Sequence, residues 1–327
     1  MNVRLGSAAA VLLSSAIVLA QSPPLKKIAD IPLSGPAVRF DYQSFDPQHD
    51  RLYIAHMNAD QLVVFDVTRR EVVANLDGFP NVHGVWAVSA INRVFASATG
   101  EHKLAVVDMQ TLKIIATPGP IKYPDGIAYA PGAERVFVSD EQGDADAVID
   151  ANTNAMVTTI PLGGGAGNTV YDSGTGHILV AVHEKNELVS IDAATAKIIG
   201  HHPLSGIESP HGIALDVENR LAFVAGEENN KLAVLDLTDG KVLAVYPVGK
   251  DPDVLAFDPG LKQLYVAAES GEVTVFREKG KTLEKLGTLS MPHAHTVAVD
   301  RKTHMVYFPL QNVDGHPLLR IMEPVRQ

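Results

Sequence analysis

A unit of about 42 residues recurs along most of this sequence, and that repeat restricts the possible folds more than any other feature. In each unit two apolar runs, separated by a polar loop, lead to an aspartate. The clearest copies are RLYIAHMNADQLVVFD from Arg51, RVFASATGEHKLAVVD from Arg93, RVFVSDEQGDADAVID from Arg135 and RLAFVAGEENNKLAVLD from Arg220. The closing aspartates, spaced by 42, 42, 42 and 44 residues, are Asp66, Asp108, Asp150, Asp192 and Asp236. Unrelated strands would not keep this register, so the chain is predicted to be a repeat protein.

A tight turn and a β-branched run follow each closing aspartate, as in DVTRREVV and DMQTLKII. An aspartate side chain accepts a hydrogen bond from the backbone two residues on, so we expect it to start the turn without a positive φ. We therefore interpret these aspartates as structural. The apolar pattern alternates with period 2, as in half-buried strands. Four short strands in a unit of this length are typical of a propeller blade.

The number of blades follows from the polar residue that opens the first strand of each unit. It is spaced by 42 or 43 residues and occurs as Asp41, His83, Asp125, Asn168, His211, Asp253 and His295. The last unit has three candidate strands, and LKKIADIPL from Leu25 offers a fourth. We therefore predict an all-β, seven-bladed β-propeller with four-stranded antiparallel blades. The N-terminal strand closes the ring, and residues 21–327 form a single domain.

The N-terminal segment has the features of an export signal. Residues 1–20 contain Arg4, an apolar run from Ala8 to Leu19 and small residues before a cleavage point. The run is too short for a membrane span, so we expect no transmembrane segment and a periplasmic or secreted protein. The chain has no cysteine, which excludes disulfides and thiolate metal sites. Its net charge of −11 disfavours nucleic acid as a partner.

The repeat resembles the YVTN repeats of bacterial and archaeal surface and periplasmic propellers. In that family a strand ending in Tyr-Val-x-Asn precedes Val-x-Val-Ile-Asp and a Thr-rich turn, and RLYIAHMNADQLVVFDVT and HILVAVHEKNELVSIDAAT carry the match. The resemblance extends over nearly the whole chain after the signal. It implies a seven-bladed propeller that binds a partner or solute, and it assigns no activity to particular residues.

The residues that open the first strands should form a ring at the mouth of the central channel. Its histidines, His83, His211 and His295, divide the seven blades as evenly as three residues can. Three imidazoles that converge with an open position suit a divalent metal ion, zinc first. The remaining ring residues, which could orient those imidazoles, are Asp41, Asp125, Asn168 and Asp253. An ordered polar ring without metal and a substrate site without metal are the other two interpretations.

A second layer of polar residues is expected above the ring. At the ends of second strands stand His56, Asp140 and His183, and His293 precedes the ring residue His295 by two positions. A histidine at a strand end is usually a solvated surface residue, but these four could form a rim over the same mouth.

Two functions from different classes follow. The first is a non-catalytic binding or scaffold propeller of the cell envelope, expected to be a monomer, with a small-molecule or protein ligand at the channel mouth. The second is a metal-dependent lyase or lactone hydrolase with its site at the propeller axis. In outline the ring is similar to the axial metal sites of peptidyl-hydroxyglycine amidating lyases and gluconolactonase-like propellers, although no sequence motif is shared.

Overall fold

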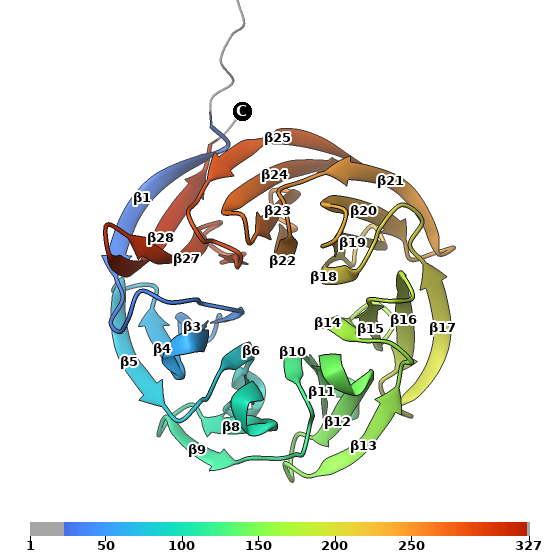
Figure 1. Cartoon of the computed structure of the whole chain (residues 1–327), viewed down its shortest axis with the longest axis horizontal. Helices are drawn as coiled ribbons and strands as arrows, with labels where there is room; N and C mark the ends of the chain where they lie inside the picture. The colour runs from blue at the N-terminus through green and yellow to red at the C-terminus, as the bar shows by residue number, and fades with distance from the viewer. Residues whose placement is uncertain (1–22, 326–327) are drawn as a thin grey trace, which may run out of the picture.

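A computed structural model describes residues 23–325 as seven four-stranded antiparallel sheets arranged as a ring (Figure 1). The predicted seven-bladed β-propeller is therefore confirmed. The predicted export signal, residues 1–20, lies outside the described residues. Within residues 23–325 the structure contains no helix of the length and apolarity needed to cross a bilayer.

Each blade contributes one strand to each of four concentric layers, with the first strand innermost (Figure 1). The first strands of blades 1 to 7 are β2 (Gln43–Asp46), β6 (Val82–Val88), β10 (Pro124–Ala130), β14 (Ala166–Asp172), β18 (Pro210–Asp216), β22 (Pro252–Asp258) and β26 (Ala298–Val299). The second strands are β3 (Arg51–His56), β7 (Arg93–Ala98), β11 (Arg135–Asp140), β15 (His177–Val182), β19 (Leu221–Gly226), β23 (Gln263–Ala268) and β27 (Val306–Val313).

The third and fourth layers complete the blades. The third strands are β4 (Gln61–Asp66), β8 (Lys103–Asp108), β12 (Ala145–Asp150), β16 (Glu187–Asp192), β20 (Lys231–Asp236), β24 (Glu272–Lys279) and β28 (His316–Pro324). The outer strands are β5 (Glu71–Asp77), β9 (Lys113–Ala116), β13 (Met156–Pro161), β17 (Lys197–Pro203), β21 (Lys241–Pro247), β25 (Thr282–Ser290) and, in blade 7, β1 (Leu25–Pro32). Short 3-10 turns lie between strands at η1 (Met57–Ala59), η2 (Ser89–Ile91), η3 (Thr99–Glu101), η4 (Pro131–Ala133) and η5 (Glu141–Gly143).

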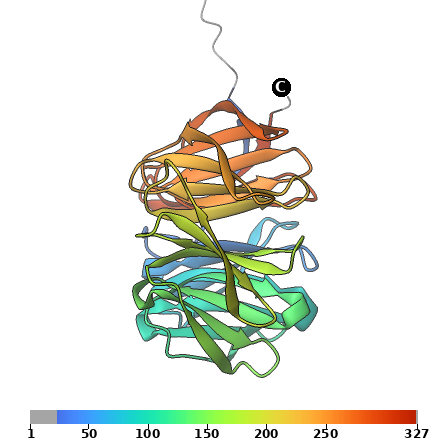
Figure 2. The same cartoon turned by 90° about the vertical axis from the view of Figure 1, so that its right-hand side faces the viewer.

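The N-terminal strand closes the ring, as the sequence predicts. Strand β1 pairs with β28 from Leu25 opposite Pro324 to Pro32 opposite Leu318. The Arg320 guanidinium also donates two hydrogen bonds to Asp30, of 2.7 and 2.8 Å. The two ends of the described chain therefore lie at the same edge of the ring (Figure 2). The pairing gives blade 7 its fourth strand, with β1 at the outer edge of the sheet.

The closing aspartates are structural, as predicted. Asp66 Oδ1 accepts a hydrogen bond of 2.8 Å from the backbone N–H of Arg69, and Asp150 Oδ1 accepts one of 2.7 Å from Thr153. None of these aspartates has a positive φ, as expected, but the fourth residue after each is left-handed. Its φ lies between 53° and 72° at Arg70, Leu112, Asn154, Ala196 and Gly240. The aspartate starts the turn and this residue reverses the chain.

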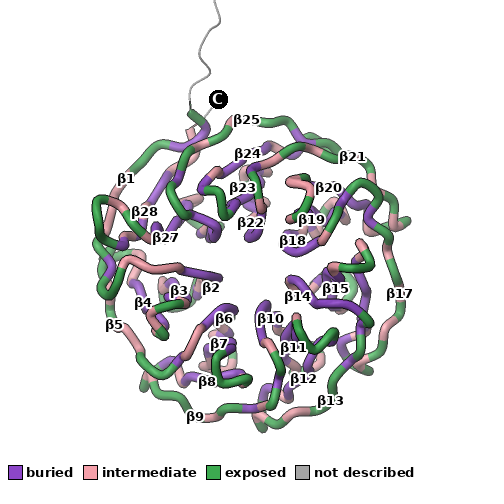
Figure 3. Tube along the Cα trace, viewed as in Figure 1, coloured by how far each residue is buried: buried purple, intermediate pink, exposed green. Residues whose placement is uncertain are grey.

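The core is packed between blades and around the axis. In blade 5, for example, the second strand β19 is fully buried, whereas the outer strand β21 alternates between exposed and half-buried residues (Figure 3). Two glycines allow the first strands to approach one another closely. A Cβ atom on Gly84 would lie 1.9 Å from the carbonyl oxygen of Asp125, and one on Gly212 would lie 1.8 Å from that of Asp253. Glycine at these positions therefore keeps the ring narrow.

Candidate functional site

The predicted ring is a buried cluster in which side chains meet across the propeller axis. Asp41, Asp125 and Asp253 are at most 4% exposed, and His211 is 8% exposed. Tyr42 Oη of blade 1 lies 3.1 Å from Nε2 of His211 in blade 5. Asp125 Oδ2 of blade 3 lies 3.6 Å from the same nitrogen. Side chains from blades 1, 3 and 5 thus approach one another near the axis, and the first strands that carry the ring are mostly buried where they surround the centre of Figure 3.

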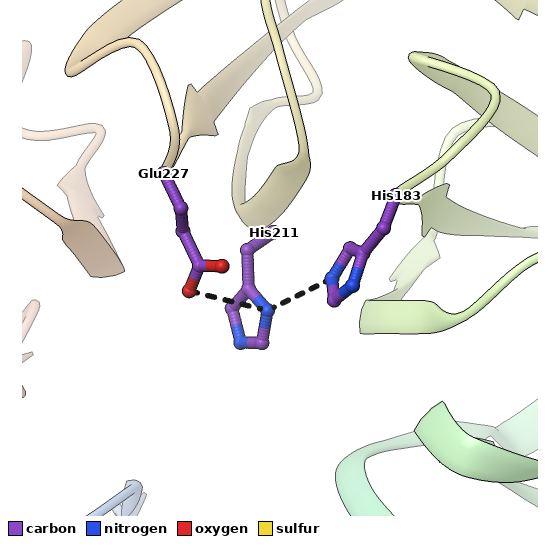
Figure 4. A group of neighbouring side chains, drawn as sticks. All are labelled: His183, His211 and Glu227. Atoms are coloured by element: carbon purple, nitrogen blue, oxygen red, sulfur yellow. Dashed lines mark hydrogen bonds and ion pairs between the residues drawn. The ribbon is translucent and has the colours of Figure 1, made fainter.

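Among residues 23–325, two sets of three side chains bring potential metal-ligating atoms within 4.8 Å of one another. The first, which we call the outer group, consists of His183, His211 and Glu227 (Figure 4). His183 directly follows β15, His211 lies in β18 and Glu227 directly follows β19. The second, the inner group, consists of Asp41, Asp253 and His295, all of them buried.

His211 is the centre of the outer group. Its Nδ1 atom lies 3.1 Å from Nε2 of His183 and 3.6 Å from Oε1 of Glu227. Its Nε2 atom lies 3.3 Å from Oδ1 of Asp253, close to the Tyr42 hydroxyl. One ring nitrogen therefore points to two potential ligands, and the other points to groups that can orient the ring.

The charges around the two histidines of the outer group separate their pKa values. Burial disfavours the charged form of His211, but Glu227, Asp253 and Asp125 outweigh it and raise the pKa of His211 to about 9. Burial, with the neighbouring His211, lowers the pKa of His183 to about 4. Without a bound ion, protonated His211 can donate its Nδ1–H to Nε2 of neutral His183.

The inner group surrounds a point between blades 1, 6 and 7. His295 Nε2 lies 3.6 Å from Asp41 Oδ1 and 3.7 Å from Asp253 Oδ2. The Arg39 guanidinium lies beside both carboxylates, with its Nη2 atom 3.8 Å from Oδ2 of each. Burial opposes the charge on Asp41, but His295, His83 and Arg39 hold its pKa below the usual value. Burial raises the pKa of Asp253.

The structure divides the three predicted histidine ligands. His211 belongs to the outer group, His295 belongs to the inner group, and His83 belongs to neither. His83 Nδ1 donates a 2.7 Å hydrogen bond to the carbonyl of Asn81, and Nε2 can then accept one of 3.1 Å from Tyr123 Oη. Both nitrogens of His83 are therefore engaged within its own region of the ring.

The other predicted ring residues also separate. Asp41 and Asp253 join the inner group, and Asp125 lies beside His211. Asn168 is half-buried and packs against Gly126, where a Cβ atom would be 2.6 Å from the Asn168 side-chain oxygen. Asn168 belongs to neither group.

Of the four predicted rim residues, His183 is the one that reaches a ring histidine. His56 is fully buried and stacks on Phe40, with ring centroids 4.0 Å apart. Asp140 caps a loop, since it accepts backbone hydrogen bonds from Tyr123 at 2.7 Å and Gly143 at 3.1 Å. His293 is exposed.

Three residues of the site, Arg39, Tyr42 and Glu227, were not predicted. Glu227 belongs to a pattern that the sequence does contain. In blades 3 to 6 a glutamate stands 16 residues after the ring position, as Glu141, Glu184, Glu227 and Glu269. Tyr42 replaces the Gly, Thr or Val that follows the ring residue in the other blades. The first feature could have identified Glu227, and the second could have identified Tyr42.

The outer group has dimensions that suit a metal ion. Four tetrahedral ligands at zinc distances place neighbouring ligand atoms about 3.3 Å apart. The two separations from His211 Nδ1, 3.1 and 3.6 Å, lie on either side of that value. Two imidazoles and a carboxylate are the protein ligands of several catalytic zinc sites, and a similar set binds iron(II).

No family model matches the sequence, and no curated protein matches it. Among solved structures, a chain of hydrazine synthase from Kuenenia stuttgartiensis is similar in fold, with a TM-score of 0.75. The similarity covers 91% of this chain and 97% of that chain, at 14% sequence identity. At this level of identity the likeness supports the propeller fold alone.

Proposed function

We propose that this protein is an exported binding propeller of the cell envelope that holds a divalent metal ion in its outer group. His183 Nε2, His211 Nδ1 and Glu227 Oε1 are the ligands in this proposal, and zinc is the first ion to test. Three protein ligands leave a coordination position for a solute or for a side chain of a protein partner. The partner would approach from the face on which β15 and β19 end.

The observation that carries the proposal is the orientation of the His211 ring. A metal-ligating histidine usually donates its second N–H to a carboxylate or another acceptor, which fixes the ring. His211 meets this condition, because Nδ1 faces His183 and Glu227 while Nε2 lies within hydrogen-bond distance, 3.1 Å, of Tyr42 Oη. A solvated surface histidine would not need a polar partner in the protein at each of its two ring nitrogens.

The inner group is the weaker site for this first ion because Arg39 already supplies a positive charge there. Its Nη2 atom lies 3.8 Å from both aspartates of that group. The outer group is also the more accessible of the two, since His183 and Glu227 are half-buried.

The cell-envelope location rests on the sequence. Residues 1–20 resemble an export signal, and the repeat resembles that of YVTN propellers, which occur in periplasmic and surface proteins. Mass spectrometry of the protein recovered from a periplasmic fraction would test both points. A mature N-terminus near Gln21 is expected, and an intact Met1 on protein confined to the cytoplasm would contradict the location.

Metal analysis of tag-free protein tests the metal site. We expect stoichiometric zinc in the wild type and in Glu228→Gln, whose glutamate is the exposed neighbour of Glu227. We expect its loss in Glu227→Gln. His183→Gln and the exposed control His293→Gln form a second matched pair. Wild-type protein that takes up no divalent metal, with an unchanged Tm when zinc is added, would overturn the proposal because binding to the native state must stabilise it.

The metal-dependent lyase or lactone hydrolase is tested with the same variants. A bound ion with an open position can polarise a carbonyl or lower the pKa of water. If turnover of a lactone or a hydroxyglycine peptide is detected, it should disappear in Glu227→Gln and persist in Glu228→Gln.

A further inference from the structure

The inner group contains buried polar atoms whose hydrogen-bonding capacity is unused. His295 is 5% exposed and Asp253 is 4% exposed. His295 Nε2, which faces both carboxylates of the group, has no hydrogen-bond partner among the described residues. The separations of 3.6 and 3.7 Å from His295 Nε2 to the two carboxylates exceed the usual hydrogen-bond range. Unpaired buried polar atoms are uncommon, and a bound ion or water is the usual explanation.

The inner group also carries more negative charge than its neighbours balance. Arg39 lies 3.8 Å from one oxygen, Oδ2, of each aspartate, and its Nη1 atom makes a closer ion pair of 2.8 Å with Glu269. One guanidinium is thus shared among three carboxylates, and the other cationic side chain beside Asp253 is His211, 3.3 Å from Oδ1. Because unbalanced buried charge is costly, the cluster would gain from a second cation. The Asp41 oxygen that faces His295 is Oδ1, which Arg39 does not contact in this arrangement.

We propose that Asp41, Asp253 and His295 form a second, inner divalent-cation site that is distinct from the outer group. The ligands are Asp41 Oδ1, Asp253 Oδ2 and His295 Nε2. Arg39 remains beside the carboxylates as a charged neighbour.

The inner site takes a different class of ion from the outer site. It offers two carboxylates and one imidazole, and carboxylate-rich sets favour ions such as Mn²⁺. Separations of 3.6 and 3.7 Å from His295 Nε2 to the two carboxylate oxygens imply a metal–ligand bond of about 2.2 Å at a tetrahedral angle. This is longer than a zinc–nitrogen bond and at the upper end of the zinc–oxygen range. Asp253 lies between the sites, since its Oδ1 faces His211 and its Oδ2 faces His295.

Manganese binding to tag-free protein loaded with one equivalent of zinc tests the inner site. Free Mn²⁺ gives a six-line electron paramagnetic resonance signal that is lost on binding, so a titration counts the manganese bound. We expect the wild type to bind one further equivalent of Mn²⁺ on top of its zinc, and Asn168→Ala, which changes a ring residue outside both groups, to do the same. Asp41→Asn and His295→Gln should lose this manganese and keep their zinc.

The outcomes separate this site from the outer one. Glu227→Gln should lose zinc and still bind manganese, so failure of the outer site would leave the inner site testable. Circular dichroism identifies a variant that fails to fold. If both inner-site variants fail to fold, the manganese titration of the wild type alone tests whether the inner site exists. A wild type that binds no Mn²⁺, or manganese binding that persists unchanged in folded Asp41→Asn, would overturn the inner site.

Discussion

The hydroxyl of Tyr42 in blade 1 lies 3.1 Å from Nε2 of His211 in blade 5, so one contact spans the propeller axis. Nδ1 of the same ring faces His183 and Glu227. Tyr42 is therefore placed to orient the proposed metal ligand His211, although Tyr42 is not itself a ligand. Partners of this kind contribute about 10- to 100-fold to metal affinity.

Tyr42→Phe should therefore weaken zinc binding by about 10-fold or more while the fold is retained. A competition titration against a chromophoric chelator measures the change. Tyr123→Phe is the matched control, since Tyr123 Oη lies 3.1 Å from Nε2 of His83, which belongs to neither group. Equal zinc affinity in Tyr42→Phe and Tyr123→Phe would show that Tyr42 does not act through His211.

Asp146 in β12 should make the protein less stable as the pH rises. The side chain is fully buried, with one hydrogen bond of 3.0 Å from Thr169 Oγ1 to Oδ2. Burial raises the pKa of Asp146 to about 7. An unfolded aspartate titrates near 3.9, so between about pH 4 and pH 7 the folded protein holds a proton that the unfolded chain has released. The contribution of protonated Asp146 to the free energy of unfolding is therefore fully present below about pH 4 and is lost above about pH 7.

Asp146→Asn should remove this dependence. The free energy of unfolding of the wild type should fall relative to that of the variant by roughly 4 kcal/mol between pH 4 and pH 8. Urea unfolding, followed by the fluorescence of Trp86, the single tryptophan, measures both. The exposed Asp144→Asn should follow the wild type. Parallel pH profiles for the wild type and Asp146→Asn would rule out this role for Asp146.

The pair between Arg320 and Asp30 should stabilise the closed ring. It joins β28 to β1 through two hydrogen bonds, and its side chains are 19% and 24% exposed. Arg320→Ala should cost about 1 kcal/mol, as expected for a bidentate, partly buried pair. Lys26→Ala is the control, because the pair that Lys26 makes with Glu323 on the same two strands is far more exposed. Thermal unfolding should show a lower Tm for Arg320→Ala alone, and equal losses in the two variants would contradict the prediction.

The repeat allowed the fold to be predicted because hydrogen bonding and alternation are local properties, copied from blade to blade. The spacing of Asp66, Asp108 and Asp150 identifies the third strands, and the unpaired run at Leu25 identifies the closing strand. The positions of the ring residues were predictable for the same reason, because residues at equivalent positions of the repeat occupy equivalent places in every blade.

The contacts between ring residues were not predictable from spacing. The even spacing of His83, His211 and His295 around the seven blades favoured their convergence at the axis. That spacing contains no information about the hydrogen-bond partners close to each histidine. Asn81 and Tyr123 hold His83 in place, while Asp41 and Asp253 surround His295. Tyr42 and Arg39 reach the site from a segment that departs from the repeat, and the periodic pattern carries no information about such a segment. Side-chain length and direction therefore determine the two groups.

Glycine after the ring residue should be required for the narrow axis, and Gly84→Ala tests this. The added methyl group would lie 1.9 Å from the carbonyl oxygen of Asp125, a distance that requires the strands β6 and β10 to separate. Overpacking typically costs about 1–3 kcal/mol and occasionally more. We expect the upper end here, because the opposing atom belongs to the backbone and cannot rotate away. Gly132→Ala is the control, because nothing lies within 4 Å of a Cβ atom there. Urea unfolding should show a large loss for Gly84→Ala alone. A Gly84→Ala protein as stable as the control would contradict the prediction, because it would mean that β6 and β10 can move apart at little cost.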